Sequence, residues 1–399
     1  MTIGRFTLTY LVVTVALCSS PDRAASGDYR LFDSAPVWPL CGHISKSPPP
    51  GWSPAQGCPS ERWGDPDHTD YPLTTTFGPR LLLSTGEIFD FHRGIDIPTE
   101  PGTPVFAMTR GVVRIAGEHP SFSDPLVQIR HFRPERWGDC RPDGCYYSIY
   151  LHMSGWVVSE GQVVEKGQHI GYTGVSSAGG NAHLHFEIRD AQPEDPLSVW
   201  QRDAIHPLRL MPYRGEPGSL RATIVDVDAA DPMRPIVQVD VSQPGTVRTM
   251  DLSRVEVEIY DNNTRTSVAQ PGRIADGNGY HVHPPFFDLE RHNRQYTHKD
   301  SSGFPWAFFA SCPFAHDHPA DYNANIHLCN HDPNDERVGV FNGVRVQPAR
   351  FNSPGRDYQL TVDFTQLTGV VDAADLCVVV NVRDARGGYG TPDTWNCSF

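Results

Sequence analysis

The segment His183-Leu184-His185-Phe186-Glu187-Ile188 decides how this chain is interpreted. Its leucine, phenylalanine and isoleucine alternate with two histidines and a glutamate, which is the period-two pattern of a β-strand with one apolar face. Both histidines therefore face the same side of the strand. Two imidazoles at positions i and i+2 can share one cavity, so that one ligates a metal while the other contacts a metal-bound water.

A second histidine segment, His92-Arg93-Gly94-Ile95-Asp96, precedes it in the chain. A helix would bring His92 and Asp96 onto one face, but the glycine between them and the alternating isoleucines favour a loop that enters a strand. Hydrolytic zinc usually takes three histidine or carboxylate ligands and leaves the fourth position for water. His92, Asp96 and His185 supply that set. Each alone is weak support for a metal, so the prediction rests on the combination.

Further motifs occur in order around these two segments. They are FGPR at 77–80, GTPV at 102–105, GVV at 111–113, YLH at 150–152, GQ at 167–168 and IG at 170–171. Together with HRGID and HLHFEI they resemble the lysostaphin-like zinc endopeptidases, or LytM peptidases, many of which cut peptide cross-links of bacterial cell walls. The resemblance extends from about residue 74 to about residue 197.

The resemblance implies a fold and a role for five residues. The fold is an all-β, lysostaphin-like antiparallel sheet. His92, Asp96 and His185 would hold zinc, whereas His152 and His183 would be the catalytic histidines. The sequence does not say which of these two is the general base.

Two features depart from the family pattern. Ala182 stands where a proline commonly precedes the HxH motif, and an unusual stretch with two cysteines, residues 132–145, precedes the YLH strand. Neither removes a predicted ligand. The insertion is expected to border the substrate groove, so substrate specificity does not carry over by analogy.

Two of the polar residues have competing interpretations. His152 is expected at the end of a strand over residues 148–152, where the residues alone favour a structural histidine and the resemblance favours a catalytic one. Glu187 shares the histidine face of its strand. It either orients a metal ligand from behind or caps the strand in solvent.

Composition and charge limit the class of protein. A length of 399 residues favours two domains with extensions, and 39% hydrophobic with 20% charged residues is typical of a globular chain. The formal net charge of −14 argues against a protein that binds nucleic acid or an anionic membrane by bulk electrostatics. We therefore expect no nucleic-acid partner.

The first twenty residues have the pattern of a secretory signal peptide. Arg5 precedes an apolar run that ends at Ser19-Ser20-Pro21. Lipidation of Cys18 is the alternative, which Leu17 disfavours because bacterial lipoproteins usually carry a small residue there. No later segment is long and apolar enough to span a bilayer. An exported protein, periplasmic or secreted, is expected.

The cysteine count favours disulfide bonds. Nine cysteines leave eight once Cys18 is removed with the signal, and an even count in an exported protein indicates disulfides. A thiolate zinc site is the alternative, but the chain has no C-x-x-C spacing. The simplest pairing joins close neighbours: Cys41/Cys58, Cys140/Cys145, Cys312/Cys329 and Cys377/Cys397.

The chain is expected to divide into four regions. Residues 1–20 are the signal peptide, and residues 21–71 form a Pro/Gly-rich extension that wraps on the catalytic domain or, alternatively, covers the zinc as a pro-segment. Residues 72–203 form the zinc peptidase domain. Short strands separated by Gly and Pro are expected there, at 105–108, 111–116, 126–131 and 146–152.

The fourth region, residues 204–399, is predicted to be a β-sandwich of immunoglobulin-like type. Apolar residues alternate with polar ones in pairs such as Val225/Val227 and in the run from Tyr358 to Phe364. A long irregular Phe/Pro-rich insertion is expected within it. Loop histidines are favoured over a second metal site for His281, His283, His316, His318, His327 and His331.

These observations predict an exported zinc-dependent endopeptidase that cuts peptide bonds in peptidoglycan stems or cross-bridges. The alternatives are a secreted protease acting on extracellular proteins, a non-catalytic activator of another wall hydrolase, and a phosphoryl carrier with paired histidines. The export signal and Asp96 argue against the carrier. The predicted cofactor is Zn²⁺, and the predicted partner is a peptidoglycan peptide or another extracellular peptide.

Overall fold

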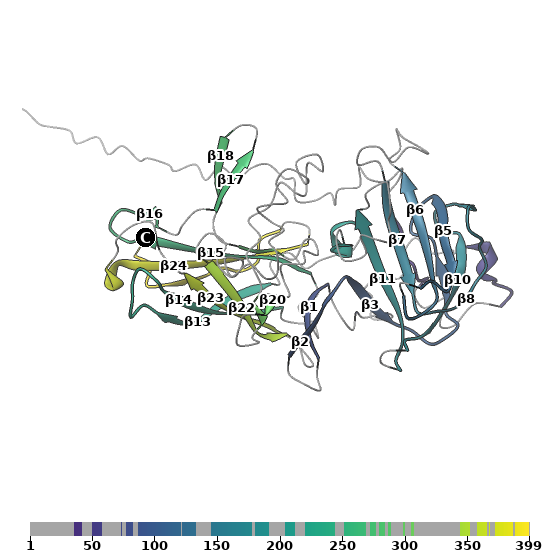
Figure 1. The fold of residues 1–399 in the computed structure, drawn as a ribbon, viewed down its shortest axis with the longest axis horizontal. Helices are drawn as coiled ribbons and strands as arrows, with labels where there is room; N and C mark the ends of the chain where they lie inside the picture. Colours follow the sequence, from purple (N-terminus) through teal and green to yellow (C-terminus); the bar gives the residue numbers. More distant parts are fainter. Residues whose placement is uncertain are drawn as a thin grey trace, which may run out of the picture.

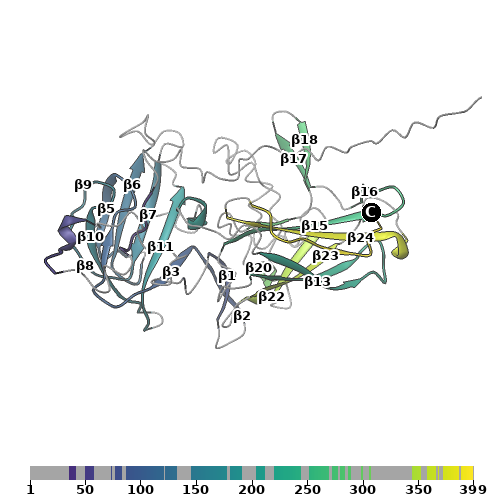
Figure 2. The same cartoon turned by 180° about the vertical axis from the view of Figure 1, so that it is seen from behind.

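The structure is a computed structural model, and Figures 1 and 2 show two β-rich bodies along its long axis. Among the described residues, no helix is long and apolar enough to cross a membrane. The described residues are 36–41, 50–57, 73, 77–82, 87–120, 122–132, 145–177, 180–190, 204–211, 220–243, 251–268, 272–276, 279–283, 286–288, 298–299, 305–306, 344–351, 357–364, 367, 372–385 and 388–398.

The first body is a ten-stranded antiparallel sheet, as the all-β prediction requires. Its path runs β4-β10-β11-β7-β6-β5-β9, with β3 and β12 paired to β11 and β8 paired to β10. The strands are β3 (Gly94–Pro98), β4 (Pro104–Phe106), β5 (Gly111–Gly117), β6 (Leu126–Phe132), β7 (Cys145–Leu151), β8 (Met153–Trp156), β9 (Val163–Val164), β10 (His169–Val175), β11 (Ala182–Asp190) and β12 (Ala204–Ile205).

Strand β11 has the predicted alternation. Leu184, Phe186 and Ile188 are fully buried in the core of this body. His183, His185 and Glu187 consequently project from the opposite face, because successive side chains of a strand point to opposite sides. The period-two prediction for the HLHFEI segment is confirmed.

His152 differs from its predicted placement at the end of a strand. Strand β7 ends at Leu151 and β8 begins at Met153, so His152 is the single residue between them. Its φ of 64° lies in the left-handed region, which a strand residue does not occupy. The alternation of apolar and polar residues before His152 gives no sign of this left-handed conformation. The predicted strand over residues 148–152 is therefore wrong at its last residue, His152.

An N-terminal segment, residues 36–41, belongs to the same core. Trp38 and Leu40 are 2% and 0% exposed. The backbone of the segment pairs beside β4, because Val37 N–H donates to Met108 O (2.8 Å) and Phe106 N–H donates to Pro39 O (2.9 Å). This part of the extension is therefore an integral piece of the peptidase body.

The second body contains two antiparallel sheets whose apolar faces share one core. One sheet has the order β13-β14-β23-β22, and the other β16-β15-β24-β25 with β19 on β15. Their strands are β13 (Arg221–Asp228), β14 (Ile236–Ser242), β22 (Val344–Phe351), β23 (Asp357–Phe364), β15 (Leu252–Asp261), β16 (Thr266–Ser267), β19 (Phe286–Asp288), β24 (Leu376–Asp384) and β25 (Asp393–Trp395). This arrangement is the predicted sandwich.

Strand β13 departs from the predicted pattern. A register shift against β14 between Ile224 and Asp226 interrupts the alternation. Val225 is 54% exposed as a result, whereas the prediction placed it on the buried face. A bulge of this kind adds a residue without any change in composition, so the sequence pattern does not reveal it.

Three two-stranded antiparallel sheets complete the described strands. They pair β1 (Gly78–Leu82) with β2 (Glu87–His92), β17 (Gly272–Asp276) with β18 (Gly279–His283), and β20 (His298–Lys299) with β21 (Pro305–Trp306). Three 3-10 turns are also present: η2 (Pro54–Gln56), η4 (Pro207–Arg209) and η8 (Ala373–Asp375).

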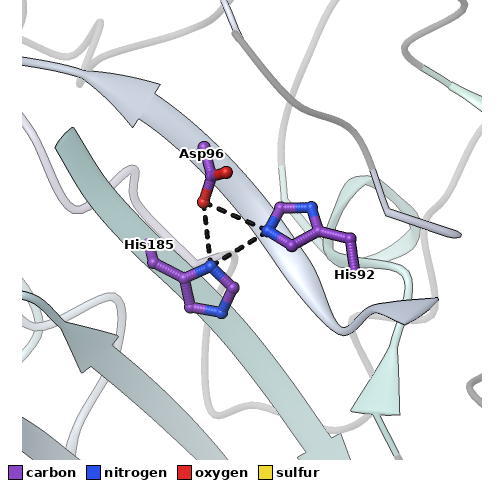
Figure 3. A group of neighbouring side chains, drawn as sticks. All are labelled: His92, Asp96 and His185. Carbon is purple, nitrogen blue, oxygen red and sulfur yellow. Dashed lines mark hydrogen bonds and ion pairs between the residues drawn. The ribbon is translucent and has the colours of Figure 1, made fainter. Parts of the chain in front are cut away.

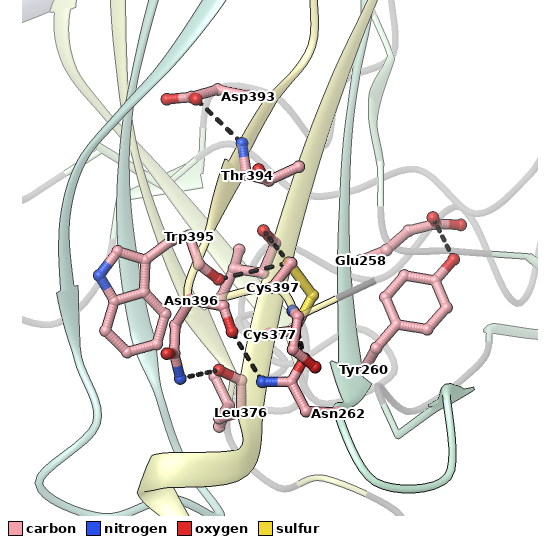
Figure 4. The surroundings of a disulfide bond; sticks show 12 residues. Glu258, Tyr260, Asn262, Leu376, Cys377, Asp393, Thr394, Trp395, Asn396 and Cys397 are labelled. Atoms are coloured by element: carbon pink, nitrogen blue, oxygen red, sulfur yellow. Dashed lines mark hydrogen bonds between the residues drawn. A yellow bond between two sulfur atoms is a disulfide. The ribbon is translucent and has the colours of Figure 1, made fainter.

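One predicted disulfide is confirmed. Cys377 of β24 is bonded to Cys397, which follows β25 (Figure 4). Cys41 and Cys145 are also disulfide-bonded. Cys58, Cys140, Cys312 and Cys329 lie outside the described residues, so the three pairings that involve them stay predictions. The signal peptide, residues 133–144 of the predicted insertion, and His316, His318, His327 and His331 also lie outside the described residues.

The connection between the bodies bears on the predicted boundary at residue 204. Strand β12 pairs with β11, and Leu208, Leu210 and Met211 are buried in the core of the first body. Ala204, in contrast, packs in the core of the second body. The predicted boundaries stay predictions, and residues 204–211 contact both cores.

Candidate active site

The two histidine segments meet because β3 and β11 are antiparallel neighbours. Asp96 is the register partner of His185, and Gly94 is the partner of Glu187. A β-carbon on Gly94 would lie 2.3 Å from the carbonyl oxygen of Phe186, so only glycine permits this close approach of the two strands. His92, the last residue of β2, is brought to the same place by the single residue that separates β2 from β3.

The side chains of His92, Asp96 and His185 converge on one point (Figure 3). Asp96 Oδ1 lies 3.1 Å from His92 Nε2 and 2.8 Å from His185 Nδ1. The two ring nitrogens are 3.0 Å apart. The structure thus brings together the three residues that the sequence predicted as ligands, with one donor atom of each facing the others.

The chemistry of these donors fits a cation. All three residues are buried. Burial raises the pKa of Asp96, but His92 and His185 outweigh burial and hold that pKa well below its usual value. An ionised carboxylate and two facing ring nitrogens need a positive charge between them. Two imidazole nitrogens and one carboxylate oxygen are a ligand set that catalytic zinc uses.

Glu187 and Arg189 support the ligand His185 from behind. Glu187 Oε1 lies 2.9 Å from His185 Nε2, and Glu187 Oε2 accepts a hydrogen bond from Arg189 Nε at 2.5 Å. Burial opposes charge on Glu187, but Arg189, His185 and Arg93 lower its pKa far below the usual value. Glu187 is 3% exposed, so the alternative of a solvent cap is wrong.

These contacts also determine the protonation state of His185 when no metal ion is bound. Burial lowers the pKa of His185, but its hydrogen bonds with Asp96 and Glu187 outweigh burial and raise the pKa to about 9. A proton or a metal ion can satisfy the same demand for positive charge. Metal binding at His185 therefore displaces a proton.

The two predicted catalytic histidines lie beside this group. The ring centroids of His152 and His183 are 4.6 Å apart, and those of His152 and His185 are 5.9 Å apart. His183 Nε2 lies 3.5 Å from Asp96 Oδ1. All five residues predicted from the sequence are therefore neighbours in space, and their individual roles stay predictions.

Sequence reasoning missed Asp124. Its Oδ2 lies 2.6 Å from His152 Nδ1, and the residue is 8% exposed. Asp124 precedes β6 in a loop without apolar periodicity, and it lies 28 residues from His152. No spacing rule links a loop carboxylate to a histidine on another element, so the sequence carries no signal for this pair.

The protonation of His152 follows from the same surroundings. Burial, together with the neighbouring His185 and His183, lowers the pKa of His152 to about 4, although Asp124 acts in the opposite direction. The ring is neutral near pH 7. Neutral imidazole is the form that accepts a proton.

Within the described ranges, His92, Asp96 and His185 are the one group of three residues that converges as a metal site. His281 and His283 lie on β18, in a strand and not in the irregular segment that was predicted. The idea of a second metal site at these histidines stays an untested alternative.

Comparisons with known proteins give matches for the first body. Residues 90–196 match the family model Peptidase family M23. The peptidoglycan DD-endopeptidase ShyA of Vibrio cholerae is 31% identical over 123 residues, which are 31% of this chain and 26% of that protein. The lipoprotein NlpD/LppB homolog of Pseudomonas aeruginosa is 37% identical over 112 residues, which are 28% of this chain and 34% of that protein.

A solved structure is also similar. The catalytic domain of lysostaphin from Staphylococcus simulans has 26% sequence identity and a TM-score of 0.26, and the match covers 35% of this chain and 90% of that one. The chain spans between a quarter and about a third of the two curated relatives named above. Residues 90–196 thus form a Peptidase family M23 domain, and the resemblance drawn from the motifs is confirmed.

Proposed function

We propose that this chain is an exported, zinc-dependent endopeptidase that hydrolyses peptide bonds in peptidoglycan stems or cross-bridges. The observation that carries the proposal is the convergence of His92, Asp96 and His185, each with a donor atom facing the other two. His152 and His183 border the same point. A set of three ligands beside two further histidines is the composition that a metal-assisted peptide hydrolase needs.

Zinc bound by His92, Asp96 and His185 would polarise the scissile carbonyl and lower the pKa of a coordinated water to about 7. The protein side chains hold the cation, orient its ligands and transfer protons. Asp96 and the two histidines hold the cation, and Glu187 fixes the ring plane of His185 through its Nε2. His152 and His183 take up a proton or stabilise the oxyanion, depending on which ring nitrogen carries hydrogen.

The choice of peptidoglycan as substrate rests on the relatives. ShyA is named a peptidoglycan DD-endopeptidase, and it is 31% identical to this chain over 123 residues. Lysostaphin is named an antimicrobial peptidase. Cleavage of peptide bonds is the chemistry that these two names share, and the name of ShyA adds peptidoglycan as the substrate.

Two rival functions remain to be separated by experiment. A secreted protease of extracellular proteins would use the same zinc chemistry, with the sandwich selecting a different target. A non-catalytic activator would use the domain for binding only. The complete set of His92, Asp96 and His185 argues against the activator, because a binding module has no need of three converging ligands.

The test compares two substrates under the same conditions. Purified peptidoglycan and casein are incubated with the zinc-loaded protein, and new amino termini are identified by mass spectrometry. We expect new termini in wall peptides, none after chelation, and recovery when zinc is returned. Cleavage of casein alone would support the secreted protease, and absence of cleavage in both substrates would refute the peptidase.

A further inference from the structure

We infer that Asp124 is a positioning residue that fixes the tautomer and orientation of His152, so that Nε2 is the nitrogen of this ring that can accept a proton in the site. The inference about the tautomer stands on the geometry of this chain. The inference about proton transfer rests on the proposed function.

The contact between Asp124 and His152 determines where the ring carries hydrogen. Asp124 Oδ2 lies 2.6 Å from His152 Nδ1, and both side chains are 9% exposed. An ionised carboxylate only accepts hydrogen bonds, so Nδ1 must be the protonated nitrogen. Nε2 then carries a lone pair. Within the described part of the chain, Nε2 makes no hydrogen bond, and the ring lies against His183 and His185.

Backbone groups hold both members of this pair. Ser177 N–H lies 3.3 Å from Asp124 Oδ1 and 3.2 Å from Asp124 Oδ2, which fixes the carboxylate. Gly174 N–H donates to the carbonyl oxygen of His152 at 2.6 Å. His152 has a φ of 64°, a conformation that a residue with a β-carbon keeps only where its surroundings impose it. The position of the ring is therefore imposed by its neighbours.

The ring of His183 has weaker hydrogen-bond partners than the ring of His152. Its Nδ1 lies 3.0 Å from the carbonyl oxygen of Asn181, a neutral acceptor, and its Nε2 lies 3.5 Å from Asp96 Oδ1. A hydrogen bond to a carboxylate is roughly twice as strong as one between neutral groups. The carboxylate of Asp124 therefore holds the ring of His152 more firmly than the Asn181 carbonyl holds the ring of His183.

The proton transfer uses the lone pair that this tautomer places on Nε2 of His152. His152 Nε2 accepts a proton from the attacking water as the bond between the water oxygen and the carbonyl carbon forms. The same Nε2 returns that proton to the amide nitrogen as the carbon–nitrogen bond breaks. The products are one carboxyl group and one free amine, and His152 returns to its starting tautomer.

The tautomer is measured directly by nitrogen NMR of metal-free protein labelled with ¹⁵N-histidine, at a pH where the ring is neutral. The His152→Gln variant identifies the signals of His152. We expect the hydrogen on Nδ1 in the unaltered protein and a mixture of both tautomers in Asp124→Ala, while Asp226→Asn, an exposed control, leaves the ratio unchanged. An unchanged ratio in Asp124→Ala overturns the inference, whether or not the protein cuts peptidoglycan.

Kinetics and zinc content test the consequence for the reaction. We expect Asp124→Ala to lower kcat by about a hundredfold or more with little change in KM, and to keep one zinc per chain. In a His152→Ala background the same change should cost less than about twofold, because the residue through which Asp124 acts is already gone. Asp124→Asn, which preserves shape, serves if Asp124→Ala does not fold.

Three kinetic results would contradict the inference. They are retention of most activity by both Asp124 variants, loss of zinc in a folded variant, and an equal further loss in the His152→Ala background. Inactivity of the unaltered protein on every peptide would refute the proposed function instead, and the NMR measurement would still decide the role of Asp124.

Discussion

The imidazole of His185 is held at both ring nitrogens, by Asp96 at Nδ1 and by Glu187 at Nε2. Glu187→Gln keeps the shape of the side chain but removes the charge that orients the ring. We expect zinc affinity to fall by about 10- to 100-fold, since partners of this kind contribute that much to metal sites. Competition with a chelating dye measures the affinity.

Glu165→Gln is the matched control for this prediction. The Glu165 side chain is 68% exposed and bridges Arg110 at 3.2 Å. The same chemical change there should leave zinc affinity unaltered. An equal loss in both variants, or no loss in Glu187→Gln, would exclude the proposed support of His185.

His183 and His185 project from the same face of β11, and their replacements should have different effects. His185→Ala removes one of three ligands and should lose most bound zinc. His183→Ala leaves the three ligands in place, so it should keep near-stoichiometric zinc and lose activity in proportion to its part in the reaction. Elemental analysis and turnover on a wall peptide measure both properties.

The outcome separates two errors. If His183→Ala loses zinc as completely as His185→Ala, the assignment of the ligands is wrong. If it keeps full activity, His183 has no part in catalysis. Circular dichroism first confirms that both variants are folded.

At the scale of single residues, the sequence predicted the contacts that follow from the spacing of residues within one segment. His92 and Asp96 follow one another closely, and His183 and His185 share a strand face, so local rules bring each pair together. Asp124 could not be predicted, because its contact with His152 depends on how a loop folds back on another element. The positive φ of His152 was equally hidden in the alternation of the strand before it.

At the scale of elements, a substitution in residues 36–41 can test whether the N-terminal extension belongs to the peptidase body. Trp38 is 2% exposed in that core. Trp38→Ala should lower the free energy of unfolding by about 3–5 kcal/mol, as other buried Trp-to-Ala changes do. Urea denaturation measures the loss.

Trp156 provides the comparison, because it is 41% exposed. Trp156→Ala should lower the free energy of unfolding by about 1 kcal/mol or less. Equal stability of the Trp38→Ala variant and the unaltered protein would mean that residues 36–41 can detach, as a removable pro-segment requires.

His206 caps the 3-10 turn η4, and its burial should make the free energy of unfolding depend on pH. Its Nδ1 accepts a hydrogen bond from Leu208 N–H, and it is fully buried. Burial, with Arg209 nearby, lowers the pKa of His206 to about 3. Unfolded histidine takes up its proton near pH 6.5. The unfolded state therefore binds more protons than the folded state between pH 6.5 and 3.

The free energy of unfolding should consequently be unaffected by His206 above about pH 6.5 and fall as the pH drops towards 3. The loss from this group is at most about 5 kcal/mol. His206→Asn retains a capping side chain but does not titrate, so its unfolding free energy should fall less over this window. Parallel curves for both proteins would show that His206 is not buried as a neutral ring.

Strand prediction succeeded where one face is buried and failed where geometry changes locally. The alternation of β11 and of the sandwich strands follows directly from burial of one face. The bulge at Ile224 and Asp226 in β13 shifts the alternation without a signal in composition. Residues 36–41 are too short for periodicity, so their place in the core could not be recognised.

At the scale of the whole molecule, the prediction of two all-β bodies agrees with the structure, because each body has its own apolar core. The contacts of residues 204–211 with both cores could not be predicted, since they depend on how the bodies are joined. The export signal and the three other cysteine pairings stay predictions, and the second metal site stays an untested alternative. The disulfide between Cys377 and Cys397 ties the last strand of the sandwich to β24.

The central claim is that one zinc ion per chain, held by His92, Asp96 and His185, is required to cut wall peptides. Its most direct test is a zinc titration of the metal-free protein, with release of new amino groups from purified peptidoglycan as the signal. We predict activity that rises linearly with added zinc and stops rising at one equivalent per chain. Activity that persists in the metal-free protein, or that fails to appear at any zinc concentration, would contradict the account.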